Sequence, residues 1–316
     1  MCENNQCICE EGWIGNGDFI FGSPACQLNV IAVKAIYGLL TCTNLINIIF
    51  TFFFLFRKFL HLGRRKPRVN CVRFIREKGV FIGFCSLFAS GFLSSLGLIR
   101  ITNPFRTIGT DVTCTLMFVL GSVFFWTFLL NITEVFLVFL SSVSSIMKIE
   151  DRSRIQSAFK QFYRYKIILW IFAPMGCIAP LFMLTDPGNP NIMFAFAAIH
   201  FLSLGFEMAF LSYLGEASLK PLIRELESLK QPSLNHLKEQ FRKFTFQVRI
   251  QRTVQSLTAI IFGLWPYVQR YSAYELPLAW SGAGSIMLFG MYSIFPRVTE
   301  LSQIKSAGDE QVSSRS

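Results

Sequence analysis

Long uninterrupted apolar runs restrict what this chain can fold into more than any other feature. A helix needs about 20 apolar residues to cross the roughly 30 Å of hydrocarbon in a bilayer. Seven runs meet or approach that length, namely 30–56, 80–98, 112–143, 167–184, 192–214, 254–268 and 278–295. A membrane-spanning segment must also satisfy its own backbone hydrogen bonds. We therefore predict an all-α membrane protein with a seven-transmembrane helix bundle.

The composition also favours a lipid environment. Of the 316 residues, 52% are hydrophobic and only 16% are charged, compared with about 25% charged residues in soluble domains. The net charge of +11 would raise the question of a nucleic-acid partner in a soluble protein. Here the basic residues fall between the apolar runs, as orientation signals do. We expect the lipid bilayer as the partner and no nucleic acid.

The distribution of Lys and Arg predicts the orientation, because cytoplasmic connections carry the excess of these residues. Of the 30 Lys and Arg residues, 26 lie in 57–78, 148–166, 220–252 and the C-terminal tail. The N-terminus is therefore expected outside and the C-terminus in the cytosol. The predicted parts are an extracellular stub at 1–29, a helix bundle at 30–296 and a disordered cytosolic tail at 297–316. The plasma membrane is the expected location, with an endomembrane as the alternative.

The N-terminal stub contains the motif CICEEGWIG at residues 7–15. With the cysteine that follows at position 26, it resembles the closing half of an EGF-like module over about 25 residues. The resemblance implies an oxidising, extracellular or luminal side. A disulfide-stapled cap without any ligand role is the alternative. The disulfide candidates, whose pairing stays open because their number is odd, are Cys2, Cys7, Cys9, Cys26 and Cys114.

Polar side chains inside the apolar runs are the main pointers to function, because a charge in hydrocarbon is costly unless it faces the bundle interior. Glu134 lies in the third run, with Asn131 one turn earlier on the same face. Glu207 lies in the fifth run, with His200 two turns earlier.

The first run adds a further polar pair, Asn44 and Asn47. One interpretation is a buried polar cluster joining the first, third and fifth helices, which would act as a proton-sensitive switch or a transport route. The other is interhelical hydrogen bonding of about 0.6 kcal/mol per contact without a functional role. Both interpretations stay open.

The sixth run contains Trp265, Pro266 and Tyr267. A proline inside a helix frees a backbone carbonyl and bends the helix. The element resembles the Trp-x-Pro hinge of rhodopsin-like receptors, although the intervening residue is missing. Ordinary interfacial aromatic residues beside a helix-end proline are the alternative.

The first inner connection is densely basic. Its residues would either touch anionic lipid or dock a cytosolic transducer. The candidates are Arg64, Arg65, Lys66, Arg68, Arg73 and Arg76.

Helix number, orientation, short outer connections and a long third inner connection together resemble G-protein-coupled receptors. The resemblance implies a receptor-like protein that passes an extracellular ligand signal to a cytosolic transducer such as a heterotrimeric G protein, with no cofactor. The alternative is a transporter or channel lined by Glu134, His200 and Glu207. An enzyme with a histidine-bound metal is not expected, because His61 and His236 lie in connections.

Overall fold

Three long helices form the part of the bundle that the structure describes. In this computed structural model the described residues are 2–3, 6–7, 11–14, 28–65, 74, 77–106, 108–109 and 111–144, with single positions between 153 and 287. The helices are α1 (Val30–Arg65), α3 (Lys78–Thr102) and α4 (Val112–Ser144). Each contains a stretch long and apolar enough to cross a membrane, which confirms three of the predicted apolar helices.

The predicted runs 30–56, 80–98 and 112–143 all lie within these helices, and α1 continues nine residues past its apolar run. The remaining four predicted spans fall outside the described residues except at isolated positions. Among those positions, Pro180 and Met287 are helical and buried. The total of seven spans and their orientation stay predictions.

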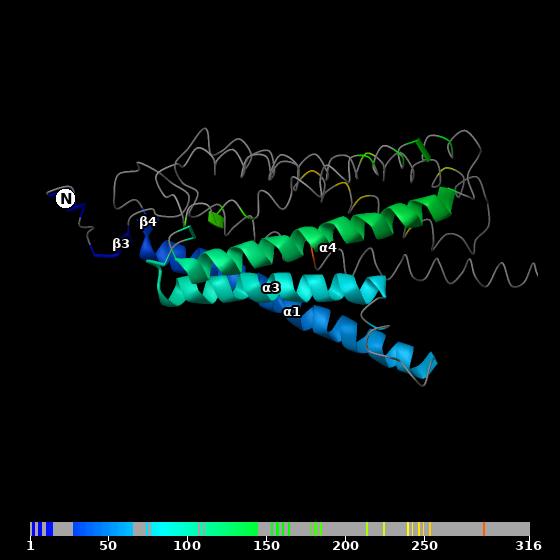
Figure 1. Ribbon diagram of the computed structural model, residues 1–316, viewed down its shortest axis with the longest axis horizontal. Helices are drawn as coiled ribbons and strands as arrows, with labels where there is room; N and C mark the ends of the chain where they lie inside the picture. The colour runs from blue at the N-terminus through cyan, green and yellow to red at the C-terminus, as the bar shows by residue number, and fades with distance from the viewer. Residues whose placement is uncertain are drawn as a thin grey trace, which may run out of the picture.

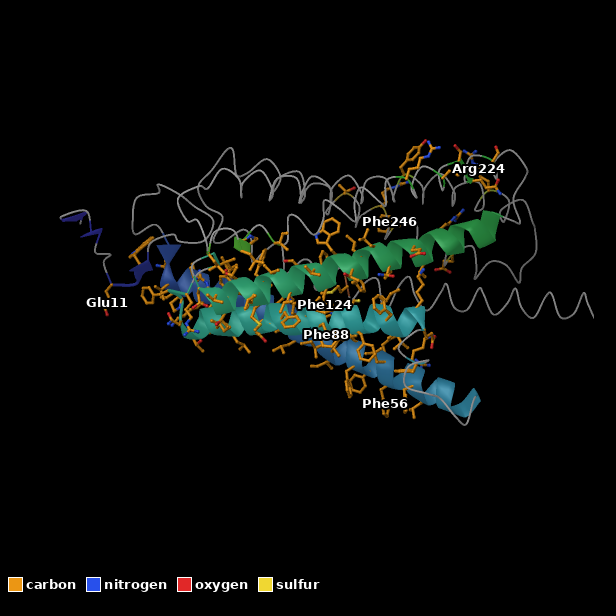
Figure 2. The ribbon with its side chains drawn as sticks, in the orientation of Figure 1. Glu11, Phe56, Phe88, Phe124, Arg224 and Phe246 are labelled. Carbon is orange, nitrogen blue, oxygen red and sulfur yellow. The ribbon has the colours of Figure 1, made fainter. Side chains whose placement is uncertain are left out.

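Helix α3 is the central element, and it packs against both α1 and α4 (Figure 1). Within the stretch that could cross a membrane, 56% of the α3 residues are buried, compared with 33% of the α1 residues. Aromatic stacking joins α3 to α4, because the Phe124 ring lies 5.2 Å from that of Phe88 and 5.9 Å from that of Phe92 (Figure 2). Figure 1 also shows α1 and α4 diverging toward the ends remote from the N-terminus.

Two short antiparallel strand pairs precede α1. β1 (Cys2–Glu3) pairs with β2 (Gln6–Cys7), and β3 (Trp13–Ile14) pairs with β4 (Leu28–Asn29). The second pair is joined directly to α1. Asn29 Oδ1 accepts hydrogen bonds from the Ile31 and Ala32 amides at 2.9 and 3.2 Å, and so caps the helix N-terminus.

The glycine of the N-terminal motif has a structural role. Gly12 has φ of 88°, a conformation that residues with a side chain rarely adopt. Its carbonyl accepts a hydrogen bond from the Val30 amide at 2.9 Å. These features hold the motif against the start of α1. The likeness to an EGF-like module stays a prediction.

Cys114 is a disulfide candidate, and its pairing stays a prediction. Among the cysteines whose side chains are described, Cys42 and Cys85 are thiols. Cys114 lies in the first turn of α4, where packing buries it completely. Its Sγ lies 3.9 Å from the carbonyl oxygen of Arg106, in the connection between α3 and α4.

Candidate functional site

A polar node at the middle of the bundle joins α1 to α3. Asn47 on α1 is fully buried, and its Nδ2 donates to Ser86 Oγ at 2.9 Å and to Ser90 Oγ at 2.7 Å. Thr51 Oγ1, one turn farther along α1, lies 3.4 Å from both Asn47 Oδ1 and Ser86 Oγ. The serines recur one turn apart on α3, which places both hydroxyls on the face toward α1.

The same node reaches a distant part of the chain. Met287 is fully buried, and its Sδ lies 4.0 Å from Asn47 Nδ2. Met287 belongs to the predicted seventh span, 240 residues later. A single amide therefore contacts three segments of the chain.

Asn44 lies one turn before Asn47 but makes no interhelical hydrogen bond among the described residues. Its Nδ2 donates to the Leu40 carbonyl of its own helix at 2.9 Å, and its Oδ1 is buried without a hydrogen-bond partner. On α3, the hydroxyl of Ser94 is likewise buried without one. The predicted pair thus divides into one residue that joins helices and one that does not.

At the end of the described helices where α3 connects to α4, a buried arginine holds α3, α1 and the α3–α4 connection together. Arg100 is fully buried, and its guanidinium carbon lies 4.9 Å from the centre of the Tyr37 ring on α1. Its Nη1 donates to the Pro104 carbonyl at 2.7 Å and to the Arg106 carbonyl. Each hydrogen bond from a charged donor contributes roughly 1.5–3 kcal/mol, so these contacts hold this end of the three described helices together.

The same connection is also fixed to α4. Asp111 Oδ1 accepts a hydrogen bond from the Cys114 amide at 2.9 Å, which caps α4. Thr115 Oγ1 accepts from the Gly109 amide at 2.8 Å. The Arg106 Nε lies 3.7 Å from Asp111 Oδ2 in a partly exposed ion pair.

Two ion pairs link the helices at the opposite end, which we predict to be the inner one. Lys58 on α1 pairs with Glu77 at 3.2 Å, and Lys78 pairs with Glu134 on α4 at 3.1 Å. Glu77 is the N-cap residue of α3 and Lys78 its first residue. A positive charge is unfavourable at a helix N-terminus, so Glu134 offsets that cost. All four side chains keep 20 to 41% of their surface exposed.

Glu134 lies far along α4. It follows Val112 by 22 residues, which is about 33 Å along the helix, and its depth in the membrane stays a prediction. Asn131, predicted to act with it, donates to the Thr127 carbonyl of its own helix at 2.7 Å. The ion pair and the Asn47 node lie at different levels of α3, because Lys78 and Ser86 are about 12 Å apart along the helix.

The other predicted site residues are not placed. His200, Glu207, Trp265 and Tyr267 lie outside the described residues. Of the basic candidates, Arg64 and Arg65 end α1, while Lys66, Arg68, Arg73 and Arg76 also lie outside the described part.

Sequence inspection missed three residues that build the site. Ser86 and Ser90 carry little hydropathy signal, although their spacing of four within an apolar run is visible. Arg100 is one of the four basic residues outside the basic connections, and its burial was not predicted. Proline disfavours the helical conformation at the residue before it. Pro104, four residues after Arg100, therefore indicates in the sequence that the helix ends just beyond Arg100.

No protein-family model matches the chain, and neither a curated protein nor a solved structure matches it. The geometry of the three helices is therefore the basis for a functional proposal.

Proposed function

We propose that this protein is a receptor-like signal transducer of the plasma membrane, with the N-terminus outside and the C-terminus in the cytosol. In this proposal an extracellular ligand binds at the outer end of the bundle and changes the inner end. A cytosolic transducer of the heterotrimeric G-protein kind then binds the inner connections.

The supporting observation is the difference between the two ends of the described helices. The outer end is closed by the fully buried Arg100 and its two carbonyl acceptors. The inner end is linked by two partly exposed ion pairs, and such pairs contribute only about 0–1 kcal/mol each. Coupling energies between two binding sites are typically about 1–3 kcal/mol. Ligand binding can therefore supply enough energy to break the inner pairs while leaving the outer end intact.

The Asn47 node lies between the two ends. Its hydrogen bonds to Ser86 and Ser90 join α1 to α3, and Met287 lies against it. Because the node is made of a few directional contacts, it restricts α1 and α3 to particular relative positions. It is the element that would couple the outer and inner ends.

The test is nucleotide-sensitive association of the purified full-length protein with a panel of heterotrimeric G proteins. Removing one inner ion pair by Lys78→Gln or Glu134→Gln should increase ligand-independent association by about fivefold at most, the value of 1 kcal/mol. Exchanging the charges in the double variant Lys78→Glu with Glu134→Lys should restore the wild-type level.

The outer ion pair offers a matched control. Arg106→Gln removes a pair of similar exposure and should leave association unchanged. If the charge exchange behaves like the single variants, the ion pair is not a switch. If well-folded protein associates with no G protein, the receptor proposal is wrong, and solute flux in liposomes then tests the transporter alternative through Glu207→Gln.

A further inference from the structure

A row of phenylalanine rings joins α3 to α4 along one side of the described helices (Figure 2). The Phe84 and Phe88 rings stack with their centres 6.4 Å apart, and the Phe124 ring lies against both Phe88 and Phe92. Neighbouring rings in the row are inclined to one another by only 17° to 32°. Each ring is therefore held in place by the next. We call Phe84, Phe88, Phe92 and Phe124 the aromatic row.

The aromatic row is open to its surroundings. Phe88 is 47% exposed, and Phe81, seven residues earlier and so on the same face of α3, is 40% exposed. The other three rings of the row are half-buried. On a helix that crosses a membrane, such a surface faces lipid. The row thus offers a rigid aromatic surface to a molecule dissolved in the bilayer.

One end of the row carries a polar side chain. Asn131 follows Phe124 by seven residues on α4, and Phe81 precedes Phe88 by seven residues on α3. The Phe88 and Phe124 rings are in contact, and the two helices run in opposite directions. Asn131 and Phe81 therefore lie at the same level, about 10.5 Å along the helices from that contact.

The carboxamide of Asn131 has an unused acceptor. Its Nδ2 donates to the Thr127 carbonyl at 2.7 Å, but its Oδ1 accepts no hydrogen bond among the described residues. The side chain is only half-buried, so a ligand can reach it. An amide oxygen without a donor is costly in apolar surroundings. The position therefore favours a ligand that donates a hydrogen bond.

We propose that a 3-hydroxysterol binds along this side of α3 and α4. Its hydroxyl group donates to Asn131 Oδ1, and its fused rings lie on the aromatic row. The distance from Asn131 to Phe124 is close to the length of a sterol ring system. A rigid ring system also loses less conformational freedom on a rigid surface than a flexible acyl chain does.

The ion pair beyond Asn131 supports this direction of binding. Lys78 and Glu134 pair at 3.1 Å one turn farther along the two helices. Charges are costly in hydrocarbon, so we expect this pair at the membrane boundary, where the hydroxyl group of a sterol also resides. The sterol site depends neither on the predicted orientation of the chain nor on G-protein coupling.

The experiment uses the full-length protein in phosphatidylcholine bilayers that contain a cholesterol analogue with a photoreactive diazirine in its ring system. Mass spectrometry maps the labelled peptides. Labelling is expected in 81–92 and 124–131, and unlabelled cholesterol should compete with it. Cholestenone has a carbonyl group in place of the hydroxyl group and cannot donate. It should compete about threefold less well, the value of one hydrogen bond inside a membrane.

Two variants separate the hydroxyl contact from the ring contact. Asn131→Leu should remove the difference between cholesterol and cholestenone. Phe88→Leu should lower the labelling severalfold, because much of the contact surface for the rings is lost. Phe53→Leu is the matched control, since Phe53 is 60% exposed on α1 and lies outside the aromatic row. It should leave the labelling unchanged.

Two results with the wild-type protein would overturn the proposal, and neither requires a variant to fold. The first is equal competition by cholesterol and cholestenone, which would mean that the hydroxyl group is not recognised. The second is labelling spread evenly over the exposed residues of α1, α3 and α4 without competition, which is the pattern of ordinary lipid contact.

Discussion

Asn44 and Asn47 lie one turn apart on α1, and both are fully buried. Their hydrogen bonds differ in whether they stabilise the packing of α1 against α3. The bonds of Asn47 go to α3 and are lost when the helices separate. The bond of Asn44 goes to the Leu40 carbonyl of its own helix and survives separation.

We therefore expect Asn47→Leu to lower the free energy of unfolding by about 1–2 kcal/mol, since interhelical hydrogen bonds in membranes average about 0.6 kcal/mol each and the two serines also lose a partner. Asn44→Leu should change it by less than about 0.5 kcal/mol, because it also removes an oxygen that lacks a partner. Unfolding in detergent, followed by reaction of a thiol-reactive dye with the buried thiol of Cys85, measures both changes. Equal losses in the two variants would contradict the assignment.

At the residue scale the sequence predicted only part of this site. It identified Asn44 and Asn47 as a polar pair on one helix, because an amide in an apolar run stands out. Which of the two joins α1 to α3 depends on the register between these helices. That register is set by packing of small side chains such as Ser86 and Ser90, whose hydropathy is unremarkable.

At the scale of helices, two glycines set the close approach of α3 to its neighbours. A Cβ added at Gly97 would overlap Thr41 Oγ1 and lie 3.0 Å from the Tyr37 carbonyl oxygen on α1. On α4, a Cβ at Gly121 would lie 2.9 Å from the side chain of Leu93. Small residues at such crossings allow helices to pack without a hydrophobic driving force.

Gly97→Ala should lower the free energy of unfolding by about 1–3 kcal/mol, because the added methyl group forces α1 and α3 apart. Adding Thr41→Ala should restore part of the loss. Gly91→Ala lies on the same helix with no atom within 4 Å of the new Cβ and should cause no loss. The same dye-based unfolding assay applies, and equal effects at the two glycines would show that helix propensity rather than packing is responsible.

Helix positions were easier to predict than helix ends. Each of the first three apolar runs lies within one helix of the structure. Hydropathy does not indicate where a helix ends outside the lipid. The extension of α1 through its basic residues to Arg65 was therefore not predicted. The capping residue Asn29 was also missed, because its role depends on the strand pair that precedes it.

At the scale of the whole molecule, one contact connects the described helices with the end of the chain. Met287 is fully buried against Asn47, so this one residue of the predicted seventh span lies beside α1. A closed arrangement of this kind agrees with a bundle, although the predicted number of spans is not decided by it. The orientation is likewise a prediction from charge alone.

A natural cysteine allows the orientation to be tested. Cys71 lies in the first basic connection, which we predict to be cytosolic. A membrane-impermeant maleimide should leave it unlabelled in intact cells and label it after permeabilisation, as read by peptide mass spectrometry, and Cys71→Ser removes the signal. Labelling of Cys71 in intact cells would reverse the predicted orientation.

The burial of Arg100 has a consequence for how the protein is made. Two of its hydrogen-bond acceptors are the carbonyls of Pro104 and Arg106, which leave the ribosome after α3 itself. Until they arrive, α3 presents an arginine whose transfer into lipid is costly. We therefore expect α3 to enter the membrane together with the turn that begins α4, as a hairpin of the two helices.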